Sequence, residues 1–245
     1  MMIHLNDLSY GYSRGVDVLS GISLSVKPGQ LLGLVGANGS GKSTVLAIMA
    51  GLLTPRQGSV LVSGGEFLEN GAGNEQRVRL VMQDADLQIV GATVEEDLLL
   101  GREAEADAGI RARDIADRFG LGDVWAAPVH SLSWGMKKKL CLAGAALDRP
   151  RVLLLDEPFS GLDYPSVREM RALIDANRQQ GITQVLAAHD LEAFVDMADR
   201  LAVLEKGTLV LEGVPADVLG RVASFGVRPP CSWVLNRSVT HGEEW

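Results

Sequence analysis

Apolar residues in the first 50 positions follow two different patterns, and both predict β-strands. Between residues 22 and 26 Ile, Leu and Val alternate with polar or small residues, which is typical of a strand buried on one face. The run LLGLVG, residues 31–36, is continuously apolar and predicts a strand buried on both faces. Residues 42–50, KSTVLAIMA, have helical spacing and stop at Gly51. The predicted order is strand, loop, helix.

Two later apolar runs, VLLLD at 152–156 and QVLAAHD at 184–190, also predict buried strands. A helical segment between them begins near Pro165 and ends at Gly181. Strands that alternate with helices are typical of a parallel sheet. Further on, LAVLE and TLVLEG are separated only by residues 206–207, which predicts a hairpin.

The middle of the chain differs from both flanks. Residues 87–149 are mostly rich in Ala, Leu and charged residues and contain helical patterns such as RARDIADRF, which ends at Gly120. We expect a helical subdomain here, inserted between core segments 1–86 and 150–220. Residues 221–245 show no clear periodicity and end in the polar stretch THGEEW, so we expect a short, loosely attached extension.

Composition narrows the class of protein. With 245 residues, 47% apolar and 22% charged, the chain fits an ordinary globular protein of one large domain. Its net charge of -8 argues against a broad nucleic-acid surface, because such binding depends on Lys and Arg. No apolar stretch approaches the roughly 20 residues that span a bilayer, and the amino terminus lacks a secretion signal, so we expect a cytosolic protein. Cys141 and Cys231 lack metal-ligand spacing and predict two reduced thiols that pack.

The clearest candidate chemistry lies in nine consecutive residues: Gly36, Ala37, Asn38, Gly39, Ser40, Gly41, Lys42, Ser43 and Thr44. They fit the pattern G-x-x-x-x-G-K-[ST] between a predicted strand and a predicted helix, as a phosphate-binding loop requires. Glycines let backbone N–H groups point at phosphate oxygens, and the helix amino end adds positive partial charge. Lys42 would bind the outer phosphates, and Ser43 a magnesium ion. The motif predicts nucleotide binding but leaves kinases, GTPases, recombinases and transport ATPases open.

A pair of acids, Asp156 and Glu157, ends the buried strand at 152–156, where open α/β sheets usually bind ligands. Asp156 could hold magnesium, directly or through water. Glu157 could polarise an attacking water as a general base. The alternative is that both acids only end a strand and face solvent, which the phosphate loop disfavours.

Several short motifs together resemble the nucleotide-binding subunit of ABC transporters over residues 3 to about 220. They are GANGSGKST, Gln83, SLSWGMKKK, LLLDEPFSGLD and the HD pair at 189–190, in this order. The resemblance implies an α/β P-loop NTPase core with a mostly parallel sheet, an antiparallel β region and an inserted helical subdomain. It also implies that residues 1–220 form one ATP-binding and ATP-hydrolysing domain.

The resemblance assigns roles to residues outside the phosphate loop. Tyr12 matches the aromatic residue that stacks on adenine. Gln83 matches the glutamine that contacts magnesium and the attacking water, and His189 matches the switch histidine at the γ-phosphate. Glu157, His189 and Gln83 are thus the candidate catalytic residues, and Ser43, Gln83 and Asp156 the candidate magnesium ligands. A structural position at a strand end is the alternative for Tyr12 and His189.

The signature loop departs from the family pattern Leu-Ser-Gly-Gly-Gln, because Trp134 and Met136 stand in two of its five positions. Ser133 and Gly135 remain, and the resemblance implies that they meet ATP bound to the opposite subunit. Asp163 ends the SGLD loop that meets the partner subunit. The two replaced residues either weaken closure around ATP, which would suit a heterodimer, or change packing only. The lysines at 137–139 predict a solvated helix face.

Residues 80–101 resemble a narrower group, the ATPases of energy-coupling-factor importers for vitamins and for metal ions such as cobalt or nickel. The features are a Gln-containing loop, then Asp86 and Gln88, then Thr93-Val94-Glu95-Glu96-Asp97. The rivals are an ordinary ABC importer or exporter ATPase, a soluble ABC ATPase acting on translation or DNA, and a nucleotide kinase. A simple acidic helix start would also explain residues 94–97.

The partners follow from this resemblance. We expect ATP and Mg²⁺ as cofactors, a second ATPase subunit in a homodimer or heterodimer, and integral membrane transporter subunits, with no nucleic acid. The chain would lie at the cytoplasmic face of the cell membrane as a peripheral subunit. An apolar groove beside residues 82–99 would receive a short helix from the membrane partner.

Overall fold

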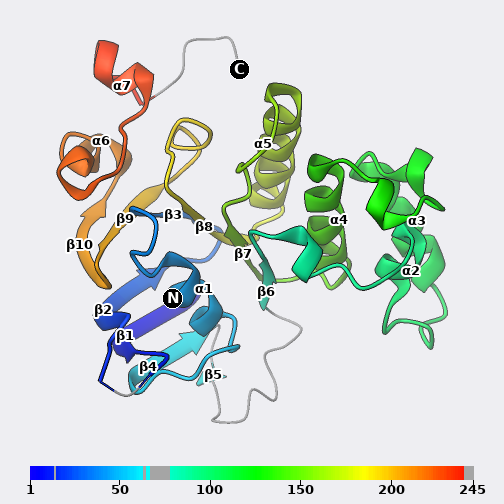
Figure 1. Ribbon diagram of the computed structural model, residues 1–245, viewed down its shortest axis with the longest axis horizontal. Coiled ribbons are helices and arrows are strands. Elements are labelled where there is room, and N and C mark those ends of the chain that lie inside the picture. Colours follow the sequence, from blue (N-terminus) through cyan, green and yellow to red (C-terminus); the bar gives the residue numbers. More distant parts are fainter. Residues whose placement is uncertain (14, 63–64, 67–77, 240–245) are drawn as a thin grey trace.

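The computed structural model describes residues 1–13, 15–62, 65–66 and 78–239 (Figure 1). The strands are β1 (Ile3–Tyr10), β2 (Leu19–Val26), β3 (Leu31–Val35), β4 (Gln57–Val62), β5 (Gly65–Glu66), β6 (Val78–Val81), β7 (Val152–Asp156), β8 (Thr183–Ala188), β9 (Arg200–Glu205) and β10 (Thr208–Gly213). The α-helices are α1 (Lys42–Met49), α2 (Val94–Leu99), α3 (Ala108–Arg118), α4 (Trp134–Leu147), α5 (Tyr164–Gln179), α6 (Pro215–Val218) and α7 (Cys231–Asn236). Single 3₁₀ turns are η1 (Ala85–Leu87), η2 (Gly122–Val124), η3 (Val129–Ser131) and η4 (Val222–Phe225).

These strands form two sheets. The first is antiparallel, in the order β2-β1-β4-β5. The second has the order β10-β9-β3-β8-β7-β6, with parallel pairs throughout except for the antiparallel pair of β9 and β10. The predicted fold class is therefore confirmed: a mostly parallel sheet, an antiparallel β region and a group of helices.

The central strand β3 shows why the parallel sheet is continuously apolar. Leu32 and Leu34 pack into the core between the two sheets, which α1 also lines. Leu31 and Val35 point the other way, into the core that the remaining helices cover. Because both faces of the sheet are covered, no position in this strand is left for a polar side chain.

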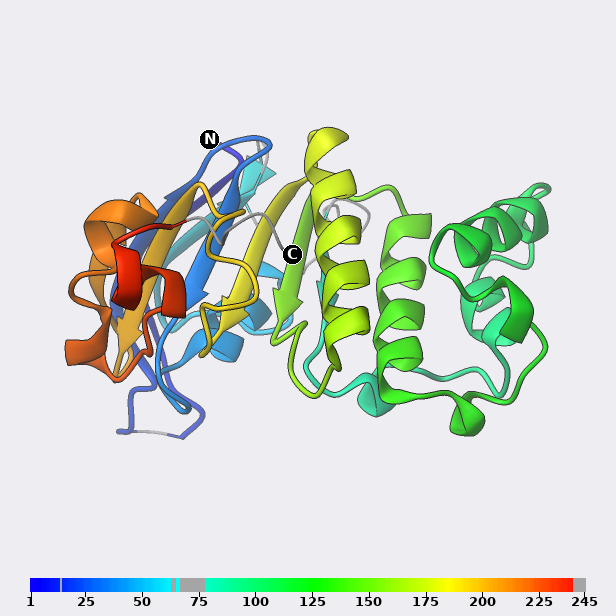
Figure 2. The same cartoon turned by 90° about the horizontal axis from the view of Figure 1, so that it is seen from above.

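Helices α2, α3 and α4 come from the segment for which a helical subdomain was predicted. Figure 2 shows α4 beside α5 along the sheet, with α2 and α3 farther out at the end of the molecule opposite α6 and α7. An ion pair between Lys139 and Glu169 joins α4 to α5. We call α2, α3 and α4 the helical unit. The subdomain boundaries at residues 87 and 149 remain predictions.

Local signals placed several elements correctly. Helices α1, α3 and α5 are each followed by a glycine with positive φ at residues 51, 120 and 181, as expected for helix ends. The hairpin of β9 and β10 turns at Lys206 and Gly207, with φ of 46° and 79°. The sequence patterns missed β1, β4 and β6. In β1 the alternation is broken near Asp7, where φ is 48° and the register with β2 shifts.

The expectation of a loosely attached carboxyl end is wrong for residues 222–227. Val222 and Val227 are 0% and 1% exposed and belong to the larger core. Two scattered valines give no periodic signal, although they cover an apolar surface of the domain. The stretch THGEEW, residues 240–245, lies outside the described residues.

The two cysteines differ, and the prediction of two packed thiols is wrong for one of them. Cys141 is buried, and burial raises the pKa of its thiol to about 12. Cys231 is exposed, because α7 lies on the surface, and its backbone N–H donates to Glu192 Oε2 at 2.8 Å. Among the described residues, no helix is long and apolar enough to cross a membrane.

Candidate active site

The phosphate loop joins β3 to α1 at the carboxyl edge of the parallel sheet. A Cβ atom on Gly36 would lie 2.4 Å from the Leu204 carbonyl oxygen and 2.5 Å from Ser40 Oγ, so no larger residue fits there. Gly41 caps α1 with φ of 105°, a conformation that strongly favours glycine. The backbone N–H of Gly207, in the β9–β10 turn, donates to the Ser40 carbonyl at 3.1 Å. The end of strand β9 and the turn that follows it therefore support the phosphate loop.

Lys42, the first residue of α1, is only 6% exposed. Its ammonium donates to the carbonyls of Gly36 at 2.9 Å and Ala37 at 3.3 Å. Glu157 Oε1 lies 3.7 Å away. Burial lowers the pKa of Lys42, and the charges of Glu157 and Asp156 oppose that shift. A buried cation thus stands inside the loop, where it could meet phosphate oxygens. In the same loop Ala37, Asn38 and Gly39 are exposed, whereas Ser40 is buried.

Asp156 at the end of β7 is the best-placed group for a magnesium ion. Its Oδ1 atom is buried and makes no hydrogen bond within the described part of the chain. Burial raises the pKa of Asp156, while a hydrogen bond with Ser43 lowers it. An unsatisfied carboxylate oxygen beside a hydroxyl is a donor set that Mg²⁺ prefers, with phosphates and water as its other ligands. The residues present therefore fit magnesium.

Glu157 has the most constrained environment in the site. Its φ is 47°, a left-handed conformation that is rare for glutamate. Both carboxylate oxygens lie 2.9 Å from His189 Nδ1, and the side chain is 10% exposed. The backbone N–H donates to the Ala187 carbonyl at 2.9 Å. The structure thus brings Glu157, His189 and Lys42 together, and holds the carboxylate where water can still reach it.

Lys138 corrects the expectation that residues 137–139 form a solvated helix face. It is 2% exposed, and its ammonium donates to the Glu157 carbonyl at 2.6 Å. Burial lowers its pKa to about 8, opposed by the charges of Glu157 and Asp156. Lys137 and Lys139 are partly buried and pair with Asp86 and Glu169, respectively. All three lysines face protein, because α4 packs between the core and the rest of the helical unit.

Tyr12 lies beside the phosphate-loop helix. Its hydroxyl and Thr44 Oγ1 are 3.2 Å apart, and its ring meets that of Tyr10 edge to face at 5.1 Å. The side chain is 66% exposed. The tyrosine is therefore tethered at its hydroxyl and keeps a large open surface, which an adenine ring could cover.

Gln83 is exposed in the loop after β6. No hydrogen bond joins it to Ser43 or Asp156 among the described residues, so no bond links it to the other two predicted magnesium ligands. The neighbouring Gln88 shapes the loop, because it accepts from Met82 N at 3.0 Å and donates to the Leu80 carbonyl at 3.1 Å.

The signature residues begin α4. Ser133 caps the helix, and its Oγ accepts from Met136 N at 3.2 Å. The Trp134 indole N–H donates to the Ser160 carbonyl at 3.2 Å, so this tryptophan contacts the SGLD loop of its own chain. Gly135 lies in the first turn. Met136 is partly buried against the larger core.

Asp163 closes the same loop by capping α5. Its Oδ1 accepts from Ser166 N at 3.1 Å, and the hydrogen bonds from Ser166 lower the pKa of the carboxyl. No hydrogen bond or ion pair joins Ser133, Gly135 or Asp163 to residues 36–44 in the described ranges. Within one chain these residues therefore form a group separate from the phosphate loop.

A family model for ABC transporters matches residues 19–160 of this chain. The cobalt import ATP-binding protein CbiO of Rhodobacter capsulatus is 39% identical over 233 residues, which cover 91% of this chain and 83% of that protein. The chain belongs to the ABC transporter family. It is thus an ABC ATPase that binds and hydrolyses ATP.

Other members of the family extend the similarity. The energy-coupling factor transporter ATP-binding protein EcfA of Methanosarcina acetivorans is 37% identical, over 94% of this ABC ATPase and 86% of its own length. The structure of cbiO1 from Clostridium perfringens, part of the transporter complex cbiONQ, superimposes with a TM-score of 0.81 at 30% identity, covering 91% and 92% of the two chains. The dimeric cassette MJ0796, bound to ADP and Pi, shares the fold with a TM-score of 0.78 at 22% identity.

An acidic groove lies on the helical unit of this ABC ATPase. It has a volume of 710 Å³ and is lined by Val90, Gly91, Ala92, Thr93, Glu95, Glu96, Leu99, Leu100, Glu103 and Ala126. This groove overlaps the second half of the segment 82–99 beside which an apolar groove was predicted, and three glutamates add negative charge to its apolar lining. That a helix of a membrane partner binds there remains a prediction.

The acidic stretch beside this groove has a clear local role. Thr93 caps α2 by accepting from Glu96 N at 3.2 Å, and Glu96 Oε2 accepts from Ala92 N at 3.0 Å. Asp97 accepts from Val90 N and Gly91 N. This arrangement resembles a capping box, except that the Glu96 carboxylate accepts from the residue before the cap, and it is what an acidic helix start would provide.

Proposed function

We propose that this ABC ATPase energises the import of a transition-metal ion or a vitamin by an energy-coupling-factor transporter. The support is its similarity to CbiO, named for cobalt import, and to EcfA, named for energy coupling. A cobalt or nickel ion would be cargo of the membrane partners. The ATPase would lie at the cytoplasmic face of the membrane, bound to those partners.

The observation that carries the catalytic part is the contact of the Glu157 carboxylate with His189 and Lys42. As a general base, Glu157 would take a proton from the attacking water, and Lys42 would balance charge at the outer phosphates. His189 holds the Glu157 carboxylate through Nδ1, and its Nε2 is available for the γ-phosphate. Asp156 and Ser43 would hold Mg²⁺, which neutralises charge on the phosphates when bound. Gln83 would join this site only after its loop moves.

A second ATPase subunit would complete the site. Ser133 and Gly135 lie at the exposed amino end of α4, where a helix can offer N–H groups to a phosphate. They do not contact the phosphate loop of their own chain, which favours contact with ATP on a partner chain. Asp163 and the SGLD loop would lie at the same interface.

The acidic groove would receive a helix from the membrane partner. Glu95, Glu96 and Glu103 favour a basic residue on that helix, while Leu99 and Leu100 favour an apolar one. The groove lies close in sequence to Gln83, so helix docking and rearrangement of the Gln83 loop would be linked.

Co-expression with membrane subunits encoded by adjacent genes tests this proposal. We expect a tagged chain to retain them on purification, and Glu95→Lys to lose them while still binding ATP. Asp123→Lys is the matched control, because Asp123 is an exposed acid in η2, between α3 and α4, and does not line the groove. Equal recovery with Glu95→Lys would contradict docking at the groove.

The identity of the retained partners separates the alternatives. A substrate-capturing membrane protein and ATP-dependent uptake of cobalt, nickel or a vitamin into vesicles would support energy-coupling-factor import. Recovery with permease subunits of another ABC importer or exporter would replace that assignment. Recovery with ribosomes or DNA would overturn the transport proposal.

A further inference from the structure

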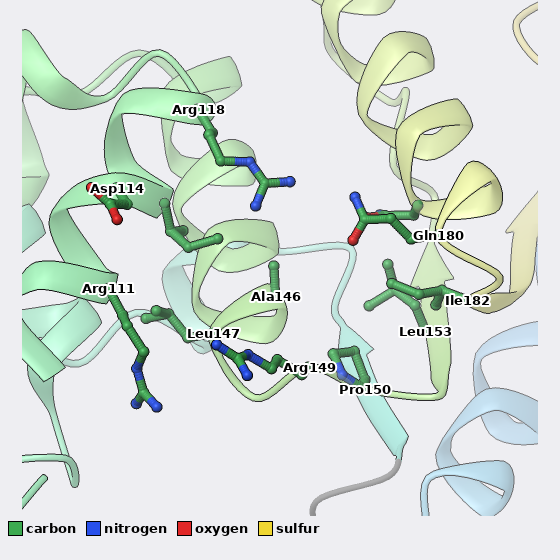
Figure 3. Close-up of a pocket in the computed structure, with 12 residues that line it drawn as sticks. Arg111, Asp114, Arg118, Ala146, Leu147, Arg149, Pro150, Leu153, Gln180 and Ile182 are labelled. Atoms are coloured by element: carbon green, nitrogen blue, oxygen red, sulfur yellow. The ribbon is translucent and has the colours of Figure 1, made fainter. Parts of the chain in front are cut away.

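A cavity of 410 Å³ lies away from the active site, between the helical unit and the core (Figure 3). Its walls come from α3, the carboxyl end of α4, the start of β7, and the end of α5 with the residues that lead into β8. We call it the seam pocket. It meets β7 at Leu153, near the amino end of the strand, whereas Asp156 of the active site lies at the carboxyl end. The two sites therefore lie at opposite ends of the parallel strands.

The seam pocket is positively charged in an acidic protein. Arg111, Arg118 and Arg149 line it, and Asp114 is the only acid among its lining residues. Two positive charges are thus in excess here, although the whole chain carries a net charge of -8. Such a local reversal of charge attracts anions.

Two of these arginines lack protein partners. Arg111 forms an ion pair with Glu105 and turns its guanidinium away from Gln180 (Figure 3). Arg118 and Arg149 make no side-chain hydrogen bond or ion pair within residues 1–13, 15–62, 65–66 and 78–239. Both side chains are exposed. Arg178, at the end of α5, is by contrast paired with Asp199. The guanidinium groups of Arg118 and Arg149 are therefore open to an anion from solvent.

Figure 3 shows how these side chains are arranged. Arg118 extends across the gap toward the carboxamide of Gln180, and Arg149 lies lower, beside Pro150. Leu153 and Ile182 add an apolar surface. The cavity falls within the range of metabolite sites, roughly 300–1,000 Å³.

Arg149 also occupies a backbone position that does not favour it. Its φ is 49°, and its N–H donates to the Ala146 carbonyl at 3.0 Å, just after α4 ends. Glycine is the usual residue in this left-handed conformation at a helix end. This turn fixes the backbone of Arg149 at the rim of the seam pocket.

We propose that the seam pocket binds a small organic anion. The guanidinium groups of Arg118 and Arg149 lie on two sides of the pocket and would offer planar donors to the oxygens of its phosphate or carboxylate group. The apolar part of the anion would rest on Leu153 and Ile182. Such an occupant would contact α3 and the core at once and would tie the helical unit to the core. This consequence rests on the proposed function: if the helical unit moves when a second subunit completes the site, the anion would slow turnover.

Phenyl phosphate is a suitable probe, since it joins a phosphate to an apolar ring. Titration calorimetry would use the full chain with Mg-ADP at saturation, so that the phosphate loop is already filled. We expect one bound equivalent, and at least about tenfold weaker binding for Arg118→Gln combined with Arg149→Gln, about 1.4 kcal/mol. Arg113→Gln is the matched control, because it removes the same charge from α3 outside the pocket. That control should bind as the wild type does.

Several outcomes would overturn the proposal. No binding, or equal binding by the double variant with an unchanged circular dichroism spectrum, would remove the site. If the double variant fails to fold, Arg118→Gln alone provides the same comparison. Binding of inorganic phosphate as tightly as phenyl phosphate would mean an adventitious ion only. If phenyl phosphate binds but leaves ATP turnover unchanged, the regulatory consequence alone is overturned and the transport proposal is unaffected.

Discussion

The core and the helical unit each provide one buried lysine to Glu157. Lys42, from the core, lies 3.7 Å from the carboxylate. Lys138, from α4 of the helical unit, donates to the backbone carbonyl at 2.6 Å. Lys42 is close to the Glu157 carboxylate, which is the proposed general base, and Lys138 binds the Glu157 backbone, which orients that carboxylate. A movement of α4 would therefore shift Glu157, so this residue couples the two regions.

The largest effect on ATP turnover is expected from a change at the core residue Glu157. Glu157→Gln keeps the shape of the side chain but removes the general base, so ATP turnover should fall at least about 10²-fold while ATP still binds. Steady-state phosphate release and a fluorescent-ATP titration would measure the two effects. Turnover close to that of the wild type would move the general base elsewhere.

Lys42→Ala should come next. If this buried ammonium binds phosphate oxygens as proposed, its loss should weaken ATP binding by about 10²-fold, because hydrogen bonds to charged groups contribute about 1.5–3 kcal/mol each. The fluorescent-ATP titration again measures the change. Lys27→Ala serves as the control, since Lys27 is exposed and lies outside the loop. Unchanged affinity in Lys42→Ala would remove the lysine from the phosphate site.

The helical side predicts a pH-dependent stability. The pKa of Lys138 is about 8 in the folded chain against an ordinary 10.5. Between these values the unfolded chain binds more protons, so the free energy of unfolding should rise as pH increases from about 8 to 10.5. We expect a rise of about 2 kcal/mol by pH 10, below the limit set by 1.36 kcal/mol per pKa unit, because the lysine of the unfolded chain is still mostly protonated at that pH.

Urea unfolding of the wild type and Lys138→Met at pH 7.5, 9 and 10 would check this. The variant should lack the rise, so the difference between the two curves isolates the lysine. A rise of equal size in both proteins would assign the effect to other groups.

Trp134→Phe should have the smallest effect. It removes the indole donor to the Ser160 carbonyl but keeps an aromatic ring, so turnover should fall by no more than about fivefold, in line with one hydrogen bond of about 1 kcal/mol. Steady-state phosphate release would measure the change. Trp233→Phe is the control, because it makes the same substitution on α7, outside the signature loop. A loss as large as that of Glu157→Gln would instead make Trp134 a central part of the site.

Much of the core was predictable because its chemistry depends on short sequence spacing. Residues 31–44 and 152–157 each combine a strand with a polar segment that follows it, and the parallel strands bring Lys42 and Glu157 to the same end of the sheet. Their roles in ATP hydrolysis remain predictions. The contact of His189 with Glu157 was not visible from spacing, because it depends on the neighbouring registers of β7 and β8.

The helical unit was harder to predict in detail. Lys138 was assigned to solvent, although it shares a helix face with Cys141, Leu142 and Ala145 at spacings of three, four and seven. That periodicity was the available signal for its burial. Val222 and Val227 offered no such signal, because irregular segments are placed by the surface that they cover. The three arginines of the seam pocket belong to none of the short motifs that carry recognisable chemistry.

The brace beneath the phosphate loop has a consequence for biosynthesis. Gly207 supports Ser40 from a turn near the end of the domain, and Leu204 closes against Gly36. On the ribosome the loop leaves the exit tunnel long before its support is made. A nascent chain that ends before this hairpin would contain the whole phosphate loop but would lack the contacts that support its conformation. Affinity for nucleotide should therefore appear late and abruptly during translation.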